Sequence, residues 1–89
     1  MKQAYLEVTF RKGRPFAAYL HLPHAAGARV ERTVEVRRGV LVDFDGAGRA
    51  IGVELPAPAH VEPEDVLAAL VEVEAEPVDL RELAPLRAA

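Results

Sequence analysis

Apolar and polar residues alternate along most of residues 1–55. The alternation runs through residues 4–10, 16–22, 30–36, 40–44 and 49–55, and turn-forming residues separate these runs. A period of two places successive side chains on opposite faces of a strand, so each run predicts a strand with one buried face. The Asp45-Gly46 pair between the last two runs is a strong hairpin signal. We therefore predict a five-stranded antiparallel β-meander over residues 1–55.

The period changes in the remainder of the chain. Pro56 and Pro58 stiffen residues 56–62 into a connector, and Pro63 suits the first position of a helix. Apolar residues at helical spacing follow, which predicts a helix over residues 63–71. Residues 71–76 alternate strictly and fit either a sixth strand or the end of this helix, with the strand slightly favoured. Asp79 can cap a last helix, whose apolar stripe would be Leu80, Leu83 and Leu86.

These elements predict a two-layer α+β fold. The sheet has one apolar face and the tail has apolar helical stripes, so burial requires one or two C-terminal helices to pack on that face. A chain of 89 residues makes one domain around one core, with a β-meander over 1–55, a Pro-rich connector over 56–62 and a helical acidic tail over 63–89. The sequence leaves open whether this tail packs on its own sheet or on a second subunit. Pairing of the sheet edges into a homodimer would cover edges that a domain this small leaves exposed.

Charge is unevenly distributed along the chain. Residues 1–50 hold nine Lys/Arg and five Asp/Glu, a balance of +4, whereas residues 51–89 hold two and nine, a balance of −7. The two halves are therefore expected to attract one another. A basic half can indicate nucleic-acid binding, but no aromatic platform or recognition helix accompanies these basic residues. We interpret the pattern as a sheet covered by an acidic tail, with no nucleic-acid partner.

The composition excludes several chemistries. The chain has no Cys and no Ser, which rules out disulfides, thiolate zinc sites and cysteine or serine nucleophiles. No apolar run approaches the length of a membrane span, and Glu7 interrupts the stretch that a signal peptide would need. A soluble cytoplasmic domain with no membrane partner is the expectation. Nine Arg against two Lys, seven Pro and no Asn fit either a heat-adapted organism or a GC-rich genome, and the sequence does not separate the two.

Few residues suggest a chemical site. His21 and His24 are three residues apart, with His60 as a third candidate metal ligand, but Pro23 and the alternation place the first two at a strand end. Asp43 and Glu54 can project from the non-core face of neighbouring strands and form an acid–base pair. Asp43 also opens a calcium-loop-like run that fails further on, because Glu54 belongs to a strand. No catalytic residue, cofactor site or metal site is therefore assigned.

Three short motifs stand out within residues 17–57: YLHL at 19–22, GVLVDFD at 39–45 and GVEL at 52–55. In these motifs the chain resembles the family of small bacterial proteins known as domain of unknown function 2283. It implies a compact β-rich domain without an established activity, and relatives beside toxin-like proteins would imply an antitoxin-like role. The chain departs from the family in the basic residues between its first two strands and in its tail after Pro56.

Three functions remain open. The leading hypothesis is a non-enzymatic interaction domain that self-associates, as a dimer, through its sheet edges or apolar tail. The second is an antitoxin-like module whose acidic tail neutralises a protein partner. The third is a metal-dependent or minor enzymatic domain that uses His21, His24 and His60 together with Asp43 and Glu54.

Overall fold

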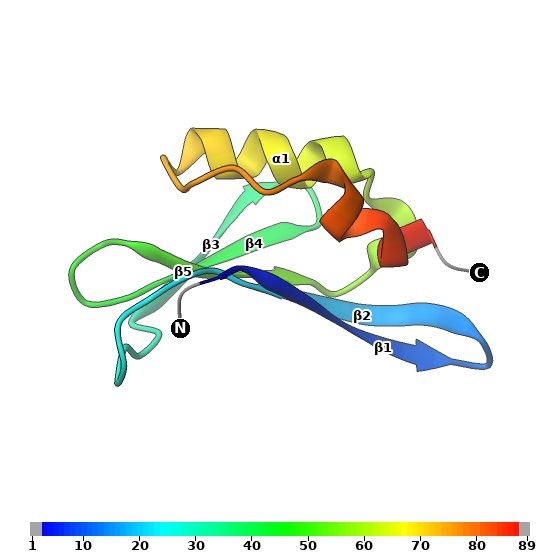
Figure 1. Ribbon diagram of the computed structural model, residues 1–89, viewed down its shortest axis with the longest axis horizontal. Helices are drawn as coiled ribbons and strands as arrows, with labels where there is room; N and C mark the ends of the chain where they lie inside the picture. The colour runs from blue at the N-terminus through cyan, green and yellow to red at the C-terminus, as the bar shows by residue number, and fades with distance from the viewer. Residues whose placement is uncertain (1–2, 88–89) are drawn as a thin grey trace.

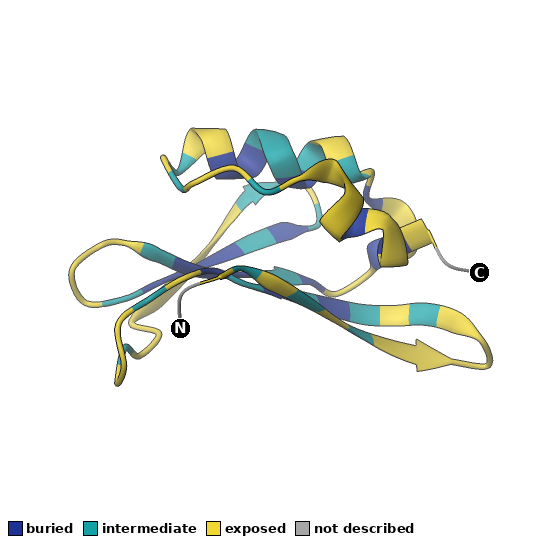
Figure 2. Ribbon diagram, viewed as in Figure 1, coloured by how far each residue is buried: buried dark blue, intermediate teal, exposed yellow. Residues whose placement is uncertain are grey.

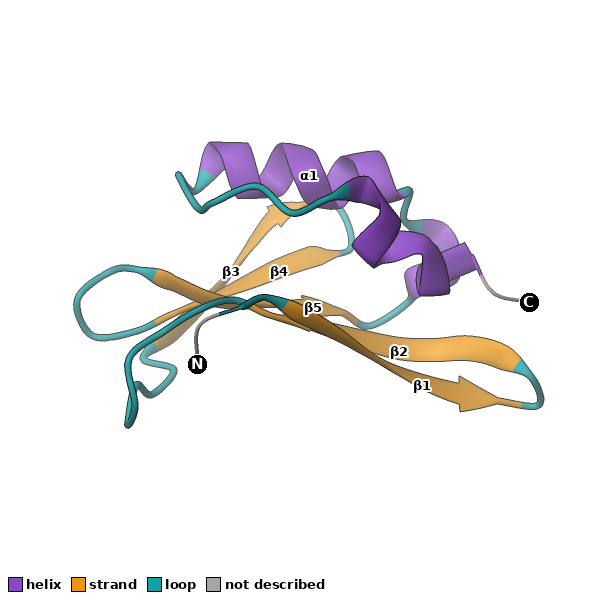
Figure 3. Cartoon of the chain, in the orientation of Figure 1, coloured by secondary structure: helices purple, strands orange, loops and turns teal. Residues whose placement is uncertain are grey.

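The computed structural model describes residues 3–87 as a five-stranded antiparallel sheet with helices over one face (Figure 1). The strands are β1 (Tyr5–Arg11), β2 (Arg14–His21), β3 (Arg32–Arg37), β4 (Val40–Phe44) and β5 (Ala50–Leu55). The 3₁₀ helix η1 (Pro58–His60), helix α1 (Pro63–Glu72) and the 3₁₀ helix η2 (Leu80–Arg87) follow. Figure 3 shows these helices together on one side of the strands. The predicted α+β class with a five-stranded antiparallel sheet is confirmed.

The order of the strands differs from that of a simple meander. The order across the sheet is β1-β2-β5-β4-β3, so β5 lies in the centre and pairs with β2 on one side and β4 on the other. The chain reaches this order because the segment from Leu22 to Glu31 carries it past β5's position to the far edge. The two central strands β4 and β5 are mostly buried, with only Leu41 on β4 and Ala50 and Glu54 on β5 partly exposed.

The core lies between the sheet and the helices. Leu20, Val42 and Val53 from the three central strands are completely buried, and Val66, Leu70 and Leu83 cover them from the helices. Figure 2 shows buried residues on the side of α1 that faces the sheet and exposed residues on its outer side. We call the side of the sheet under the helices the covered face and the opposite side the uncovered face. The C-terminal tail packs on the covered face of its own sheet.

Helix α1 begins as predicted, but the preference for a strand over residues 71–76 was wrong. The helix continues to Glu72 and ends in a Schellman motif, in which Ala75 N–H donates to Leu70 O (2.9 Å) and Glu74 N–H to Val71 O (3.1 Å). Glu74 takes the left-handed conformation that this motif requires, with φ of 58°. Val73 and Ala75 then pack against the core, so the apolar positions of the alternating run serve a helix end.

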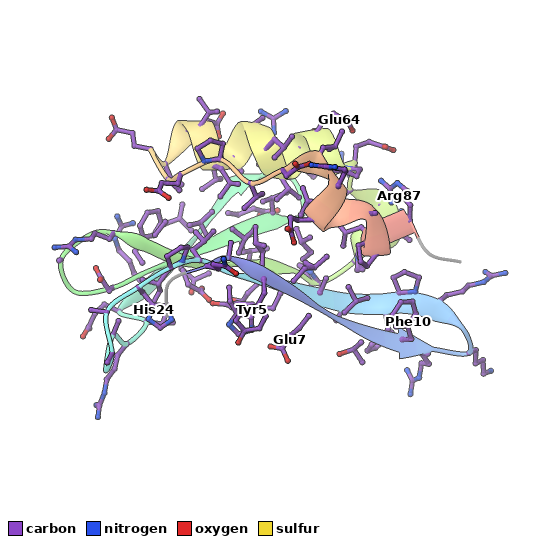
Figure 4. The ribbon with its side chains drawn as sticks, viewed as in Figure 1. Tyr5, Glu7, Phe10, His24, Glu64 and Arg87 are labelled. Carbon is purple, nitrogen blue, oxygen red and sulfur yellow. The ribbon has the colours of Figure 1, made fainter. Side chains whose placement is uncertain are left out.

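The last helical segment confirms the predicted cap at Asp79. The Asp79 carboxylate accepts a hydrogen bond from Arg81 N–H at 2.9 Å, and Leu83 and Leu86 are buried whereas Leu80 is exposed. Arg87 ties this segment to the connector, because its guanidinium donates to the Val61 carbonyl and pairs with Glu62 at 3.1 Å. Figure 4 shows Arg87 in the helical layer.

Charge attraction between the two halves of the chain has a structural counterpart. Arg37, at the end of β3, pairs with Asp65 at 3.4 Å and with Glu72 at 3.5 Å, near the two ends of α1. The side chain of Arg37 lies partly buried between β3 and the helix.

The β1–β2 hairpin extends beyond the helices. Its tip, residues 10–16, is the longest projection in Figure 1, and Figure 2 shows it without buried residues. We call residues 10–16 the arm. Within residues 3–87, no helix has the length and apolar character needed to cross a membrane.

Candidate functional site

The uncovered face carries two adjacent rows of side chains that cross all five strands. The strand pairing aligns Tyr5, His21, Gly52, Asp43 and Thr33 in one row, and Glu7, Tyr19, Glu54, Leu41 and Glu35 in the next. In Figure 4, Tyr5 and Glu7 lie on the side of the sheet away from the helices. Six members make up what we call the polar cluster: Glu7, Tyr19, His21, Thr33, Asp43 and Glu54.

Asp43 is the centre of the polar cluster. It is only 4% exposed although no helix covers this face, and it is the one buried charged residue among those described. The Tyr19 hydroxyl donates to Asp43 Oδ2 at 2.8 Å, and the Thr33 hydroxyl donates to Oδ1 at 2.5 Å. Both carboxylate oxygens therefore have donors, which offsets the cost of withdrawing this group from water.

Gly52 allows Tyr19 to reach Asp43. Tyr19 lies on β2 and Asp43 on β4, so the phenol must cross the central strand β5. A Cβ atom at Gly52 would lie 1.8 Å from the Tyr19 hydroxyl oxygen, a distance that no side chain tolerates. The missing side chain of Gly52 thus provides the space in which the tyrosine crosses the strand.

His21 joins β1 to the cluster. Its Nε2 contacts Glu7 Oε1, and its ring stacks on Tyr5 with centroids 4.3 Å apart. The same imidazole meets Tyr19 edge to face at 4.7 Å. The three rings therefore form a continuous aromatic contact along one end of the polar cluster.

Two pKa values in the cluster are raised. The pKa of Glu54 is raised by its hydrogen bond with Asp43, by burial and by the negative charge of Asp43. Burial, the hydrogen bond to Asp43 and the charges of Asp43 and Glu54 also raise the pKa of the Tyr19 phenol. Glu54 consequently holds a proton more tightly than an ordinary glutamate.

The structure brings together some of the residues that the sequence singled out. Asp43 and Glu54 do share the uncovered face and interact, as the alternation predicted. The histidines are dispersed: His21 contacts Glu7, His24 Nδ1 contacts the Ala25 carbonyl in the following loop, and His60 lies in η1 beside Arg37 and Arg38. Across residues 3–87 no three His, Asp or Glu side chains are grouped so that they could hold a metal ion.

Sequence reasoning missed Tyr19, Thr33, Gly52 and Glu7 as members of this site. Alternation alone shows that they share a face, but their contacts depend on β2 lying beside β5. One signal was present in the sequence, since Gly52 lies in the middle of the alternating run over residues 49–55. A glycine within a strand often marks the close approach of another group.

No family model, curated protein or solved structure matches this chain. The polar cluster and the arm are therefore interpreted from their own geometry.

Proposed function

We propose that this protein is a self-associating interaction domain, in which the arm of one copy docks on the helical layer of a second copy. The observation that carries this proposal is the pair of exposed phenylalanines on the arm, Phe10 and Phe16, which are 47% and 53% exposed. Large apolar side chains on a projecting hairpin gain free energy when a partner covers them. In this function the domain acts by binding.

The arm is cationic as well as apolar. Arg11, Lys12 and Arg14 surround the two phenylalanines, and the Arg11 guanidinium lies 4.8 Å from the centre of the Phe16 ring. Paired with exposed aromatic rings, these charges favour an acidic partner surface that also offers apolar contacts.

The helical layer of the same chain is such a surface. Val71 on α1 and Leu80 on η2 are 73% and 46% exposed, the former among the most exposed large apolar residues described. The exposed carboxylates around them are Glu62, Glu64, Glu72, Glu74, Glu76, Asp79 and Glu82. Figure 4 shows Glu64 on the outer side of this layer, away from the sheet. Arm and helical layer are thus complementary in charge, and both expose apolar side chains.

A second copy is the partner that best accounts for both surfaces. When two complementary patches lie on one chain, a two-fold dimer forms each contact twice and leaves neither patch open. The dimer would also enlarge the small apolar core that an 89-residue domain can build.

The test is the molar mass of the protein by light scattering across a dilution series. We expect a dimer for the natural chain, and a monomer when Phe10→Ser and Phe16→Ser are combined. Val30→Ser is the matched control, because Val30 is an exposed apolar residue outside the arm, and it should leave the dimer intact. Added salt should weaken the dimer, since exposed charges are screened. A monomer at every concentration, or an arm variant that dimerises like the natural chain, would overturn the proposal.

A basic protein is a second candidate partner, as the antitoxin-like role requires. The specific observation is the row of exposed carboxylates on the helical layer, which outnumber the arginines that pair with this layer, Arg37, Arg81 and Arg87. This alternative needs the helical layer and not the arm. The Phe10→Ser, Phe16→Ser protein should therefore still bind such a partner, whereas it could not form the dimer.

A further inference from the structure

We propose that a hollow beside the polar cluster binds a guanidinium group, the charged end of an arginine side chain. The hollow lies between Glu7 on β1, Tyr19 on β2 and Glu54 on β5. It is on the uncovered face, whereas the proposed dimer uses the arm and the helical layer. The inference is therefore independent of self-association.

The size and lining of the hollow suit one planar cation. Its volume is about 390 Å³, which holds a guanidinium group with part of its alkyl chain. Thr9 and Tyr19 provide polar and aromatic contacts, and Ala17 and Pro56 add apolar surface. No lysine, arginine or histidine lines it, so the two carboxylates are the only charged groups that do.

The strand register sets the two carboxylates on either side of the tyrosine. Glu7 is paired with Tyr19 across β1 and β2, and Tyr19 is paired with Glu54 across β2 and β5. His21 contacts only Oε1 of Glu7, so its second oxygen can accept a hydrogen bond from a ligand. Tyr19 itself is held in place by its hydrogen bond to Asp43, which gives the hollow a preformed wall.

This arrangement selects guanidinium over other cations. A guanidinium is planar, carries five N–H donors in a rigid fork and stacks on aromatic rings, so it can contact the tyrosine and both carboxylates together. An ammonium offers three donors from one point and holds its water more strongly. The ligand is therefore an arginine that another protein or a peptide exposes on its surface.

The test is a titration of the ¹⁵N-labelled natural chain with N-acetyl-arginine amide, followed by NMR. The protein is kept at a concentration at which light scattering gives the mass of a monomer, so that dimer formation does not contribute to the observed shifts. N-acetyl-citrulline amide is the matched control ligand, because it has nearly the same shape without the charge. We expect the arginine compound to shift the amide signals of residues 7, 19 and 54 in a saturable manner, and the citrulline compound to leave them unchanged.

Three variants locate the site. Glu54→Gln and Glu7→Gln should each lower the association constant about fivefold or more, since each removes one charge-assisted hydrogen bond. Glu35→Gln is the matched control, because Glu35 lies in the same row on the same face but outside the hollow. It changes the net charge equally and should leave the association constant unchanged. Thermal unfolding of each variant verifies that it is folded.

Three results would overturn the inference. One is equal binding of the citrulline and arginine compounds, which would show that the charge is not recognised. Another is an equal loss of affinity in Glu35→Gln and Glu54→Gln, which would show attraction to the whole acidic surface. Stronger binding of N-acetyl-lysine amide than of the arginine compound would also contradict the preference for a planar cation.

Discussion

The two faces of this sheet are built from the same strands but are stabilised by different interactions. On the covered face, Leu20, Val42 and Val53 pack against helices and make no polar contact. On the uncovered face, the neighbouring positions hold Tyr19, Asp43 and Gly52, and a tyrosine takes the place of a covering helix. The comparison teaches that a sheet face without covering helices can still bury a carboxylate. Here the aromatic side chain of one strand crosses the central strand and hydrogen-bonds the carboxylate on the far side.

The largest expected effect is on the covered face. Leu20→Ala removes a fully buried side chain and leaves a cavity under the helices, which should lower the free energy of unfolding by about 2–5 kcal/mol. Urea unfolding followed by circular dichroism measures this change. Leu41→Ala is the control, because Leu41 lies on the uncovered face of β4 and is only partly buried. An equal loss in the two variants would contradict the assignment of the core to the covered face.

The next effect concerns the crossing of Tyr19 over β5. Gly52→Ala places a methyl group in the space of the phenol, so it should displace the tyrosine and cost about 1–3 kcal/mol. The same substitution should cost much less in a Tyr19→Ala background, where the space is empty. The double-mutant cycle by urea unfolding measures this coupling. Additive costs would show that the tyrosine does not occupy the space above Gly52.

A smaller effect, and a gain, is expected in the layer that covers the sheet. Glu74 adopts a left-handed conformation at the end of α1, a position where glycine carries no steric penalty. Glu74→Gly should therefore raise the free energy of unfolding by about 0.5–1 kcal/mol. Glu76→Gly, two residues further along the chain, should not stabilise the protein. Thermal unfolding compares the two, and a loss of stability in Glu74→Gly would contradict the helix end described above.

The smallest effect is a change in pH dependence on the uncovered face. The folded state raises the pKa of Glu54 above its unfolded value, so the contribution of this group to stability is full below the unfolded pKa and is lost as pH rises through the folded pKa. Glu54→Gln should match the natural chain at pH 4 and be more stable at pH 8. The difference should be on the order of 0.5 kcal/mol, because solvent screens this partly exposed group. A natural chain that gains stability relative to Glu54→Gln as the pH rises would contradict the raised pKa.

Local patterns in the sequence predicted most of the elements but not their neighbours. The alternation of Val40, Val42 and Phe44 defined β4 to the residue, and Pro63 marked the start of α1. Alternation also placed Asp43 and Glu54 on one face. It could not show that β2 pairs with β5, because that contact joins residues more than thirty positions apart and depends on the path of the segment between them.

The end of α1 shows a second limit of local patterns. Val71, Val73 and Ala75 alternate with glutamates and read as a strand, yet helical and extended backbones can both bury such a short run. The helical conformation is favoured because it lets Leu70 and Val73 pack on the core. Tyr19 was missed for the related reason that its partner lies two strands away.

The pairing of β2 with β5 has a consequence for the order of folding. It aligns Ala18–His21 with Gly52–Leu55 and is the only ladder that joins the β1–β2 hairpin to the β3–β4–β5 unit among the described residues. The turns within each unit close short loops, whereas this ladder must close a long one, which is slower. We expect the two units to form first and the hydrogen bonds between β2 and β5 to form afterwards. The amide protons of that ladder would then be the last to gain protection when refolding is followed by pulsed hydrogen exchange.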